Sequence, residues 1–390
     1  MFRITNFQEL MKGLPRSAFD QVVRKHNADK YCKRFGHWDH LIAMMYAQLS
    51  GTTGLRPLQT AFNSHEPHLY HLGTSPIKRS TLADANEKRS DTVFSEIAQW
   101  LMGHVSAQLR KETKELMFLL DSTSVTLKGR EFDRWTSNNQ TRNTQGMKLH
   151  VLLESSSQAP VWTRFSAANV NDVELAREVP LLPGALYVFD KGYCDYNWWN
   201  DISVAEARFV TRFKYNASLV VLQDQDIALE DRGIVLKDEL VKFKRKYPSG
   251  KRVNKHFDKP LRRITILRAD NPKPLLLATN DLTSSAKDIA QAYKDRWGIE
   301  LFFKWIKQHL KIKSFFGRTE NAVRIQIVTA LISYLLVALY KQRHSLKQTL
   351  WDCLCLIRAA LFQHRDSEES PYRRRKRDEE YAAHKQGALF

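Results

Sequence analysis

"ELMFLLDSTSVTL" occupies residues 115–127 and marks the point where the chain changes from helical to strand-like patterning. Four apolar residues precede Asp121, and the Thr- and Val-rich stretch that follows favours a strand. Further strands are predicted at MKLHVLLES (147–155), APVWTRFSA (159–167), ALYVFD (185–190) and RFVTRFK (208–214). Helices are predicted between them, at NDVELAREVPLLP (171–183) and YNWWNDISVAEA (196–207). This arrangement predicts an α/β layer fold.

The chain before this stretch has the periodicity of helices. HWDHLIAMMYAQLSG (37–51) spaces apolar residues at helical intervals and ends at Gly51, a residue suited to a helix C-terminus. STLADANEKRSDTVFSEIAQWLMGHVSAQLRK (80–111) predicts one amphipathic helix with its N-cap at Ser80 or Thr81.

The chain after residue 214 first loses the α/β rhythm and then becomes helical again. Residues 215–268 alternate short β-like pieces with basic turns, which predicts a β-rich insertion. LRRITILR (261–268) and KPLLLATND (273–281) read as its last hairpin or as the return to the main sheet. A helix capped by Thr283 or Ser284 then follows, and another covers residues 319–340. Its apolar run at 327–340 is too short to span a bilayer comfortably, so we expect a buried core helix.

Composition narrows the class of protein. The chain is 43% hydrophobic and 26% charged, as globular proteins are, and its N-terminus resembles no signal peptide. Its four cysteines form no CxxC pair, which argues against a zinc site or a disulfide framework and fits a reducing cytoplasm. These cysteines are Cys32, Cys194, Cys353 and Cys355.

The charge balance predicts a polyanionic partner. Lys and Arg total 61 against 42 Asp and Glu, a net charge of +19. Residues 236–268 alone hold 12 Lys and Arg against 3 Asp and Glu, or +9, counted along the sequence. A solvated Lys-rich surface would have the same composition, but this concentration favours nucleic acid over a membrane, because no amphipathic membrane helix accompanies it. YRRRKRDEE (372–380) predicts a weakly ordered basic arm.

Two carboxylates end apolar strands, where burial is expensive unless the charge is paired or bound to metal. Asp121 follows MFLL and Asp190 follows YVF. One such acid is often a capping residue. Two acids on strands that can lie side by side suggest a catalytic site, although the sequence does not show that the strands are neighbours.

A third carboxylate lies in YKDRWGIELFFKWIKQHLKI (293–312), which we expect to be helical. At about 100° per residue, one stripe collects six side chains: Tyr293, Arg296, Trp297, Glu300, Lys304 and Lys307. The opposite side carries Ile299, Phe302 and Ile306. A surface ion pair between Glu300 and Lys304 would explain those two residues, but not the aromatic side chains beside them. Aromatic and cationic groups next to a carboxylate suit nucleic acid held at a metal site.

Three oxygen-donor carboxylates match the preferences of Mg²⁺ or Mn²⁺. Two such ions about 4 Å apart would activate a water or a 3′-hydroxyl and stabilise the leaving oxygen of a phosphodiester. We therefore expect Asp121, Asp190 and Glu300 to be both catalytic and metal-binding.

These motifs resemble the bacterial insertion sequence four family of DDE transposases. Tyr293, Arg296, Glu300 and Lys307 fit its Y-x2-R-x3-E-x6-K signature, LLDSTS looks like its first-Asp strand, and FDKGY looks like its second-Asp motif. The resemblance runs from about Asp121 to Tyr340. It implies an RNase H-like core interrupted by the β-rich insertion, and metal-dependent cut-and-paste transposition of DNA.

The resemblance also implies roles for the stripe. Tyr293, Arg296 and Lys307 would contact the transposon-end DNA, with Lys304 sharing that role, and Trp297 would stack on a displaced base. Relatives form a DNA hairpin by flipping a base, which a Trp in their insertion helps to hold. Residues 268–276, RADNPKPLL, contain no aromatic side chain, and the chain departs from the family there.

The expected organisation follows from these segments. A helical DNA-binding domain (1–112) would read the terminal inverted repeats, and the two core parts (113–214 and 271–345) would flank a phosphate-gripping insertion (215–270). A C-terminal helix and basic tail (346–390) would end the chain. Partners would be double-stranded DNA, both terminal repeats and target, with at least a dimer in the synaptic complex, in the bacterial cytoplasm at the nucleoid.

Two other functions share parts of this pattern. An RNase H-like nuclease would keep the acids and the metal but cut DNA without strand transfer. An inactive transposase remnant would bind DNA only, although the presence of all three acids argues against it.

Overall fold

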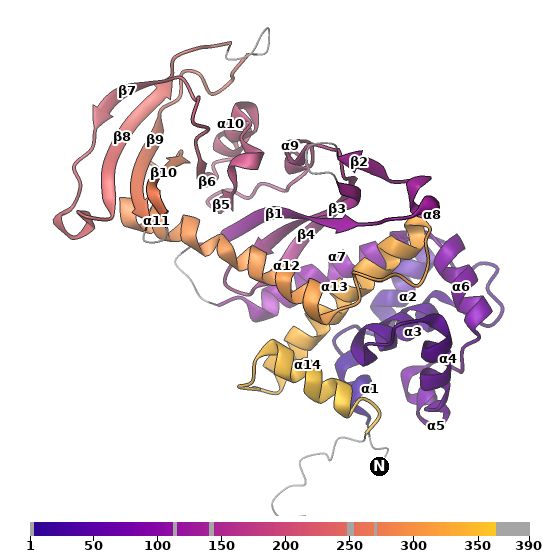
Figure 1. Ribbon diagram of the computed structural model, residues 1–390. Helices are drawn as coiled ribbons and strands as arrows, with labels where there is room; N and C mark the ends of the chain where they lie inside the picture. The colour runs from indigo at the N-terminus through magenta and orange to yellow at the C-terminus, as the bar shows by residue number, and fades with distance from the viewer. Residues whose placement is uncertain (1–3, 112–114, 140–143, 248–252, 269–270, 364–390) are drawn as a thin grey trace, which may run out of the picture. The chain divides into compact units, whose positions relative to one another are not determined.

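The computed structural model describes residues 4–111, 115–139, 144–247, 253–268 and 271–363 (Figure 1). Contacts divide them into two units: the described residues up to Leu82 together with those from Leu336 onward, and Ala83–Leu335. Both divisions fall inside helices, α6 (Arg79–Lys88) and α13 (Glu320–Arg343). The domain boundaries predicted from the sequence separate segments by expected function, and these two compact units do not test them. The predicted basic arm at 372–380 lies outside the described residues.

The first unit is built from helices. They are α1 (Asn6–Met11), α2 (Arg16–Lys25), α3 (His37–Ser50), α4 (Leu55–Asn63), α5 (Glu66–Leu69), the 3₁₀ helix η1 (Tyr70–Leu72) and α14 (Leu350–Ala359). Helix α3 ends as predicted at Gly51, whose φ of 72° lies in the left-handed region that glycine adopts without strain. Helix α14 begins with a capping box between Thr349 and Asp352.

The predicted single helix at 80–111 is wrong, because the chain forms two helices there. Helix α6 ends at Lys88, and α7 (Thr92–Leu109) begins four residues later. The Ser95 hydroxyl donates to Asp91 Oδ2 at 2.7 Å, and the hydroxyls of Ser90 and Thr92 lie 2.6 Å apart. Such short polar side chains bond locally and favour a break over a continuous helix.

The second unit contains a ten-stranded sheet (Figure 1). Its strands are β1 (Met117–Thr126), β2 (Ser137–Asn139), β3 (Thr144–Glu154), β4 (Ala159–Ala167), β5 (Leu186–Phe189), β6 (Arg208–Arg212), β7 (Leu219–Asp224), β8 (Val235–Phe243), β9 (Leu261–Arg268) and β10 (Asn271–Thr279). The spatial order is β2-β3-β1-β5-β6-β10-β9-β8-β7, with β4 paired to β3. All five strands predicted between residues 115 and 214 are confirmed.

Strand direction changes across the sheet. β1, β5 and β6 run parallel, whereas β3 and β10 are antiparallel to their neighbours β1 and β6. Strands β7, β8 and β9 come from the segment predicted as β-rich, and they extend the same sheet beyond β10. The two alternatives left open for 261–281 both hold, since β9 and β10 form a hairpin and β10 returns to β6.

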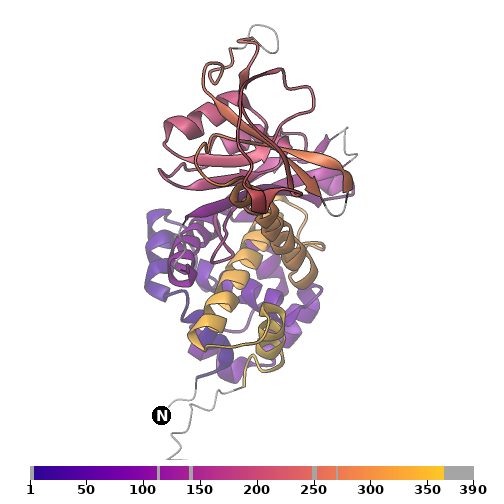
Figure 2. The same ribbon diagram turned by 90° about the vertical axis from the view of Figure 1, so that its left-hand side faces the viewer.

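Helices cover both faces of the sheet. Helix α10 (Tyr196–Val204) packs Trp198 and Trp199 on Phe189 and Phe209, with ring centroids 4.6 Å and 5.0 Å apart for the closest pairs. Helices α11 (Ala286–Asp295) and α12 (Trp297–His309) cover the other face, and Figure 2 shows them leaving the sheet opposite α10. This sandwich buries the apolar strand residues that precede the two aspartates.

Several helices differ from their predicted extents. Helix α9 (Asp172–Ala176) stops well before Pro180. Helix α11 is capped by Ser285, whose hydroxyl accepts from Asp288 N, and not by Thr283 or Ser284. Both of those residues instead donate to the buried Asp281 carboxylate, which holds the turn before the helix.

Remaining short elements are α8 (Arg130–Asp133) and the 3₁₀ helices η2 (Lys191–Tyr193) and η3 (Leu229–Asp231). By length and composition α13 could cross a membrane, but 89% of its most apolar 18-residue window is buried inside the protein. This burial supports the prediction of a core helix.

Candidate catalytic site

The two predicted aspartates lie side by side. Strands β1 and β5 pair in parallel with Leu120 opposite Phe189, so the next residue of each strand, Asp121 and Asp190, reaches the same end of the sheet. The carboxyl ends of adjacent parallel strands are where α/β proteins commonly place their functional groups. Both residues were predicted from the sequence, and the register of the two strands shows that they are neighbours.

Glu300 approaches from helix α12. The helix lies close to β1 because Gly298 has no side chain: a Cβ there would sit 3.2 Å from Leu119 Cδ1. Leu119 and Asp121 point to the same side of β1, as alternate strand residues do, so the helix that touches Leu119 also reaches the acid. The apolar side of α12 is buried as predicted, at Ile299, Phe302 and Ile306.

Arg296 links two of the three acids. One guanidinium nitrogen donates to Glu300 Oε1 at 2.5 Å, and the other lies 3.9 Å from Asp121 Oδ2. The predicted helix is interrupted at this residue, since α11 ends at Asp295 and α12 begins at Trp297. The ion pair on this stripe is therefore Arg296–Glu300, and not the Glu300–Lys304 pair considered from spacing.

Asp190 has its own cation, which the sequence reasoning missed. Arg212, the last residue of β6, donates to Asp190 Oδ1, and the Tyr293 hydroxyl lies 3.5 Å from the same oxygen. The guanidinium carbons of Arg212 and Arg296 stand 5.9 Å and 5.7 Å from the centre of the Tyr293 ring. Only the position of Arg212 at the end of a predicted strand could have indicated it, because strand order was unknown.

The pKa values of the two aspartates are shifted in opposite directions. Burial raises the pKa of Asp121 to about 6; the Ser122 amide and Arg296 oppose this, and the Glu300 and Asp190 charges add to it. Burial also acts to raise the pKa of Asp190, but the hydrogen bond and charge of Arg212 outweigh it and hold that pKa below its usual value. The charges of Glu300 and Asp190 act on Asp121, as expected of carboxylates that lie near one another.

The donor set suits a divalent cation in its chemistry. Three carboxylates from β1, β5 and α12 offer only oxygen ligands, and their negative charge demands compensation. In the structure Arg296 and Arg212 supply that charge. Within the described ranges, no three His, Cys, Asp or Glu side chains are grouped tightly enough to hold one ion as they stand. The metal-binding role of the acids stays a prediction.

The other members of the predicted stripe make no ion pair with the acids among the described contacts. Trp297 is 57% exposed, and Lys304 is also exposed. Burial, with the nearby Lys313, lowers the pKa of Lys307. Neither lysine forms an ion pair with another described residue, so both charges are available to a ligand.

A buried polar network supports the strand behind Asp121. Lys148 Nζ on β3 donates to Asp172 Oδ1 at 2.9 Å and to Val170 O at 2.7 Å. The Ser122 hydroxyl donates to the same Asp172 oxygen at 3.1 Å. His150 lies beside the pair, and burial lowers its pKa to about 4. This network fixes the residue next to Asp121, and nothing in the spacing of the sequence indicated it.

Acids at the ends of adjacent parallel strands, joined by a third from a covering helix, define an α/β protein with a DDE-type core. Comparison with known families agrees, because residues 112–336 match the family described as Transposase DDE domain. The chain belongs to this family of DDE transposases. Residues 3–75 match a second family, a domain of unknown function, DUF4372.

Named relatives are transposases. The chain is 40% identical over 294 residues to a "Putative transposase y4zB" of Sinorhizobium fredii, covering 75% of this chain and 79% of the relative. It is 28% identical over 262 residues to a "Probable transposase for insertion sequence element IS5377" of Geobacillus stearothermophilus, covering 65% and 66%. It is 27% identical over 292 residues to a "Putative transposase for insertion sequence element IS4SA" of Synechocystis, covering 72% and 77%.

Among solved structures, the fold resembles a piggyBac transposase, described as a synaptic complex with hairpin DNA. The TM-score is 0.51 at 12% identity, covering 96% of this chain and 84% of that one. At this identity the likeness concerns the fold alone.

Proposed function

We propose that this DDE transposase cleaves DNA at the ends of a bacterial insertion sequence and joins the freed ends to target DNA, using Asp121, Asp190 and Glu300. The observation that carries the proposal is the parallel register of β1 and β5, which sets two acids side by side under the helix that bears the third. Membership of the DDE family supports cleavage and strand transfer as the activity.

The three acids would hold two divalent ions, either Mg²⁺ or Mn²⁺. Divalent ions bound there would supply an activated oxygen nucleophile and stabilise the leaving oxygen of the phosphodiester. The protein's own contribution is to place three carboxylates at one point and to balance their charge. Arg296 and Arg212 now provide that balance.

The DNA end would lie along the α12 stripe. Lys304 and Lys307 would contact phosphates, and Tyr293 and Arg296 would lie against the terminal nucleotide beside the acids. The exposed ring of Trp297 would stack on a displaced base, which would allow a hairpin intermediate.

The sheet order supports an RNase H-like core. Strands β4, β3, β1, β5 and β6 lie in that spatial order, with β1, β5 and β6 parallel, and β7 to β9 would be the basic insertion that grips phosphates. The helices of residues 1–112 would read the terminal inverted repeats. Because transposition joins two ends, the active complex would be at least a dimer, working on cytoplasmic DNA at the nucleoid.

The proposal is tested by Asp190→Asn. This variant should lose DNA cleavage while keeping its affinity for a duplex carrying the terminal repeat, because the amide cannot replace a ligand carboxylate. Asp201→Asn, on the exposed side of α10, is the matched control and should cut normally. An Asp190→Asn protein that cut as fast as the wild type would disprove the assignment.

The nuclease alternative predicts a different product. Paired terminal repeats, a target plasmid and Mg²⁺ should yield joined molecules with the wild-type protein. Cleavage without any joined product would instead identify a nuclease.

A further inference from the structure

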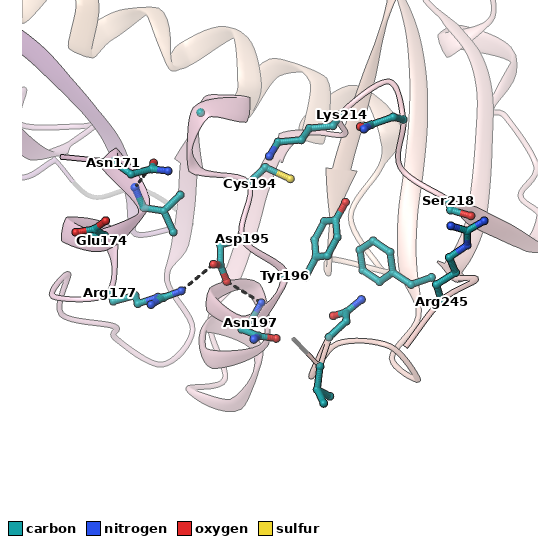
Figure 3. A pocket seen from close by; sticks show the side chains of 16 residues that line it. Asn171, Glu174, Arg177, Cys194, Asp195, Tyr196, Asn197, Lys214, Ser218 and Arg245 are labelled. Carbon is teal, nitrogen blue, oxygen red and sulfur yellow. Dashed lines mark hydrogen bonds and ion pairs between the residues drawn. The ribbon is translucent and has the colours of Figure 1, made fainter. Parts of the chain in front are cut away.

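A large polar cleft lies near Asp190, and no DNA segment has been assigned to it so far, although one of its walls belongs to the insertion proposed to grip phosphates. Its volume is about 710 Å³, and it lies between α9, the start of α10, and the segment from the end of β6 to the start of β7 (Figure 3). All of its lining residues belong to the unit Ala83–Leu335.

The two sides of the cleft differ in charge. On the α9 side, Arg177 is neutralised by Asp195 at 2.8 Å, and Glu174 stands beside it. The opposite side carries Lys214 and Arg245, both exposed and neither forming an ion pair with another described residue. Figure 3 shows Arg245 on this second side, and the Lys214 side chain extending from that side toward Cys194. An anionic ligand would therefore follow the side formed by β6, β7 and β8.

A buried amide on the lining is left without a partner. Asn254 is 3% exposed; its carbonyl oxygen accepts from His256 N at 2.9 Å, but its Nδ2 donates to no other described atom. This nitrogen is also shielded from solvent, so it offers no contact to a ligand in the cleft, and the case for an anionic ligand rests on the cations.

The cleft continues toward Asp190. A second cavity of about 570 Å³ is lined by Asp190 and Arg212, and it shares Gly192, Lys214 and Asn216 with the first. A DNA strand bound in the cleft could thus reach Asp190 from the side of η2 and α10.

This approach is opposite to that of the proposed DNA end. Helix α12 packs on the face of the sheet that carries Leu119, whereas α10 packs on the other face. Strand transfer requires two DNA segments at one set of acids, and they must arrive by different paths. We infer that the cleft between α9, α10 and the β6–β7 segment binds the phosphate backbone of the target DNA.

The inference rests on the proposed function, and its test separates the two. Arg245→Glu lies on the charged side but outside the cavity that contains Asp190. Cleavage of a terminal-repeat duplex should fall by less than joining does, because the phosphate contact of Arg245 is inferred to be with the target. Joining of pre-cleaved ends to a plasmid should fall by about tenfold at moderate salt, as expected when one phosphate contact is lost.

Arg245→Lys is the matched control, because it keeps the charge and should restore joining. Lys214→Gln should lower joining in the same direction. Unchanged joining in both Arg245→Glu and Lys214→Gln would overturn the inference. So would an equal loss of cleavage and joining, which would assign the cleft to the transposon end. A wild-type protein that neither cleaves nor joins would contradict the proposed function instead.

Discussion

At the scale of single residues, burying ionised acids at the candidate site lowers the free energy of unfolding of the protein. Asp121 is mostly buried among two other carboxylates, and only Arg296 and a backbone amide offset its charge. Asp190 is better compensated, because Arg212 pairs with it directly. Asp121 is therefore the less compensated of the two aspartates, and a cation bound to the proposed site would supply the missing charge.

Asp121→Asn should therefore make the metal-free protein more stable at neutral pH. The folded-state pKa of about 6 lies above the ordinary value of 3.8, so the ionised carboxylate disfavours folding above pH 6. The gain should approach roughly 3 kcal/mol at pH 7.5 and shrink to about 0.5 kcal/mol at pH 4, where the folded-state acid is protonated but the unfolded-state acid is still about half ionised. Urea unfolding with EDTA at both pH values measures it. Equal gains at pH 7.5 and pH 4 would contradict the assigned cause.

At the scale of elements, close packing and a buried network place the acids. Helix α12 can lie against β1 because Gly298 presents no Cβ to Leu119. On the other face of the sheet, Lys148 and Asp172 tie β3 to the start of α9 and hold the Ser122 hydroxyl. The strand that carries Asp121 is thus fixed from both sides, which keeps the carboxylate in one position.

Lys148→Met should be strongly destabilising. The change removes one member of a buried ion pair and leaves the Asp172 carboxylate without its cation, at a cost of about 3–5 kcal/mol. Denaturant unfolding measures the loss. Lys148→Met/Asp172→Asn should recover part of it, since the unpaired charge is then gone. If the double variant were no more stable than the single one, the ion pair would not be the cause.

At the scale of the whole molecule, the sheet joins the site to the basic segment. Strands β7 to β9 continue from β10, which pairs with β6, the strand that ends in Arg212. Strands β8 and β9, which contain part of the segment 236–268 with its excess of nine positive charges, therefore extend the same sheet that carries the acids. A chain with a net charge of +19 should bind DNA with strong salt dependence.

The salt dependence can be traced to particular lysines. Lys242 and Lys244 are exposed at the end of β8. If both contact phosphates, Lys242→Gln/Lys244→Gln should reduce the slope of log affinity against log salt by about 2. Fluorescence anisotropy with a duplex of fixed length measures the slope. An unchanged slope would mean that this part of the insertion does not touch DNA.

The amino-acid sequence by itself determined the α/β fold class and the family, and it singled out the three acids that are proposed as the catalytic site. Apolar strands ending in Asp121 and Asp190, and the period of the helix bearing Glu300, are local patterns that need no knowledge of strand order. One failure was also local: the break between α6 and α7 lies where the short polar side chains of Ser90, Asp91 and Thr92 bond locally.

Only the tertiary structure decided what surrounds those acids. Parallel register made Asp121 and Asp190 neighbours, and strand order brought Arg212 to Asp190 from 22 positions away. The Lys148–Asp172 pair and the polar cleft likewise join segments that are distant in sequence. Periodicity shows which side of an element is apolar, but long-range pairing determines which elements meet, because it depends on how the whole sheet closes.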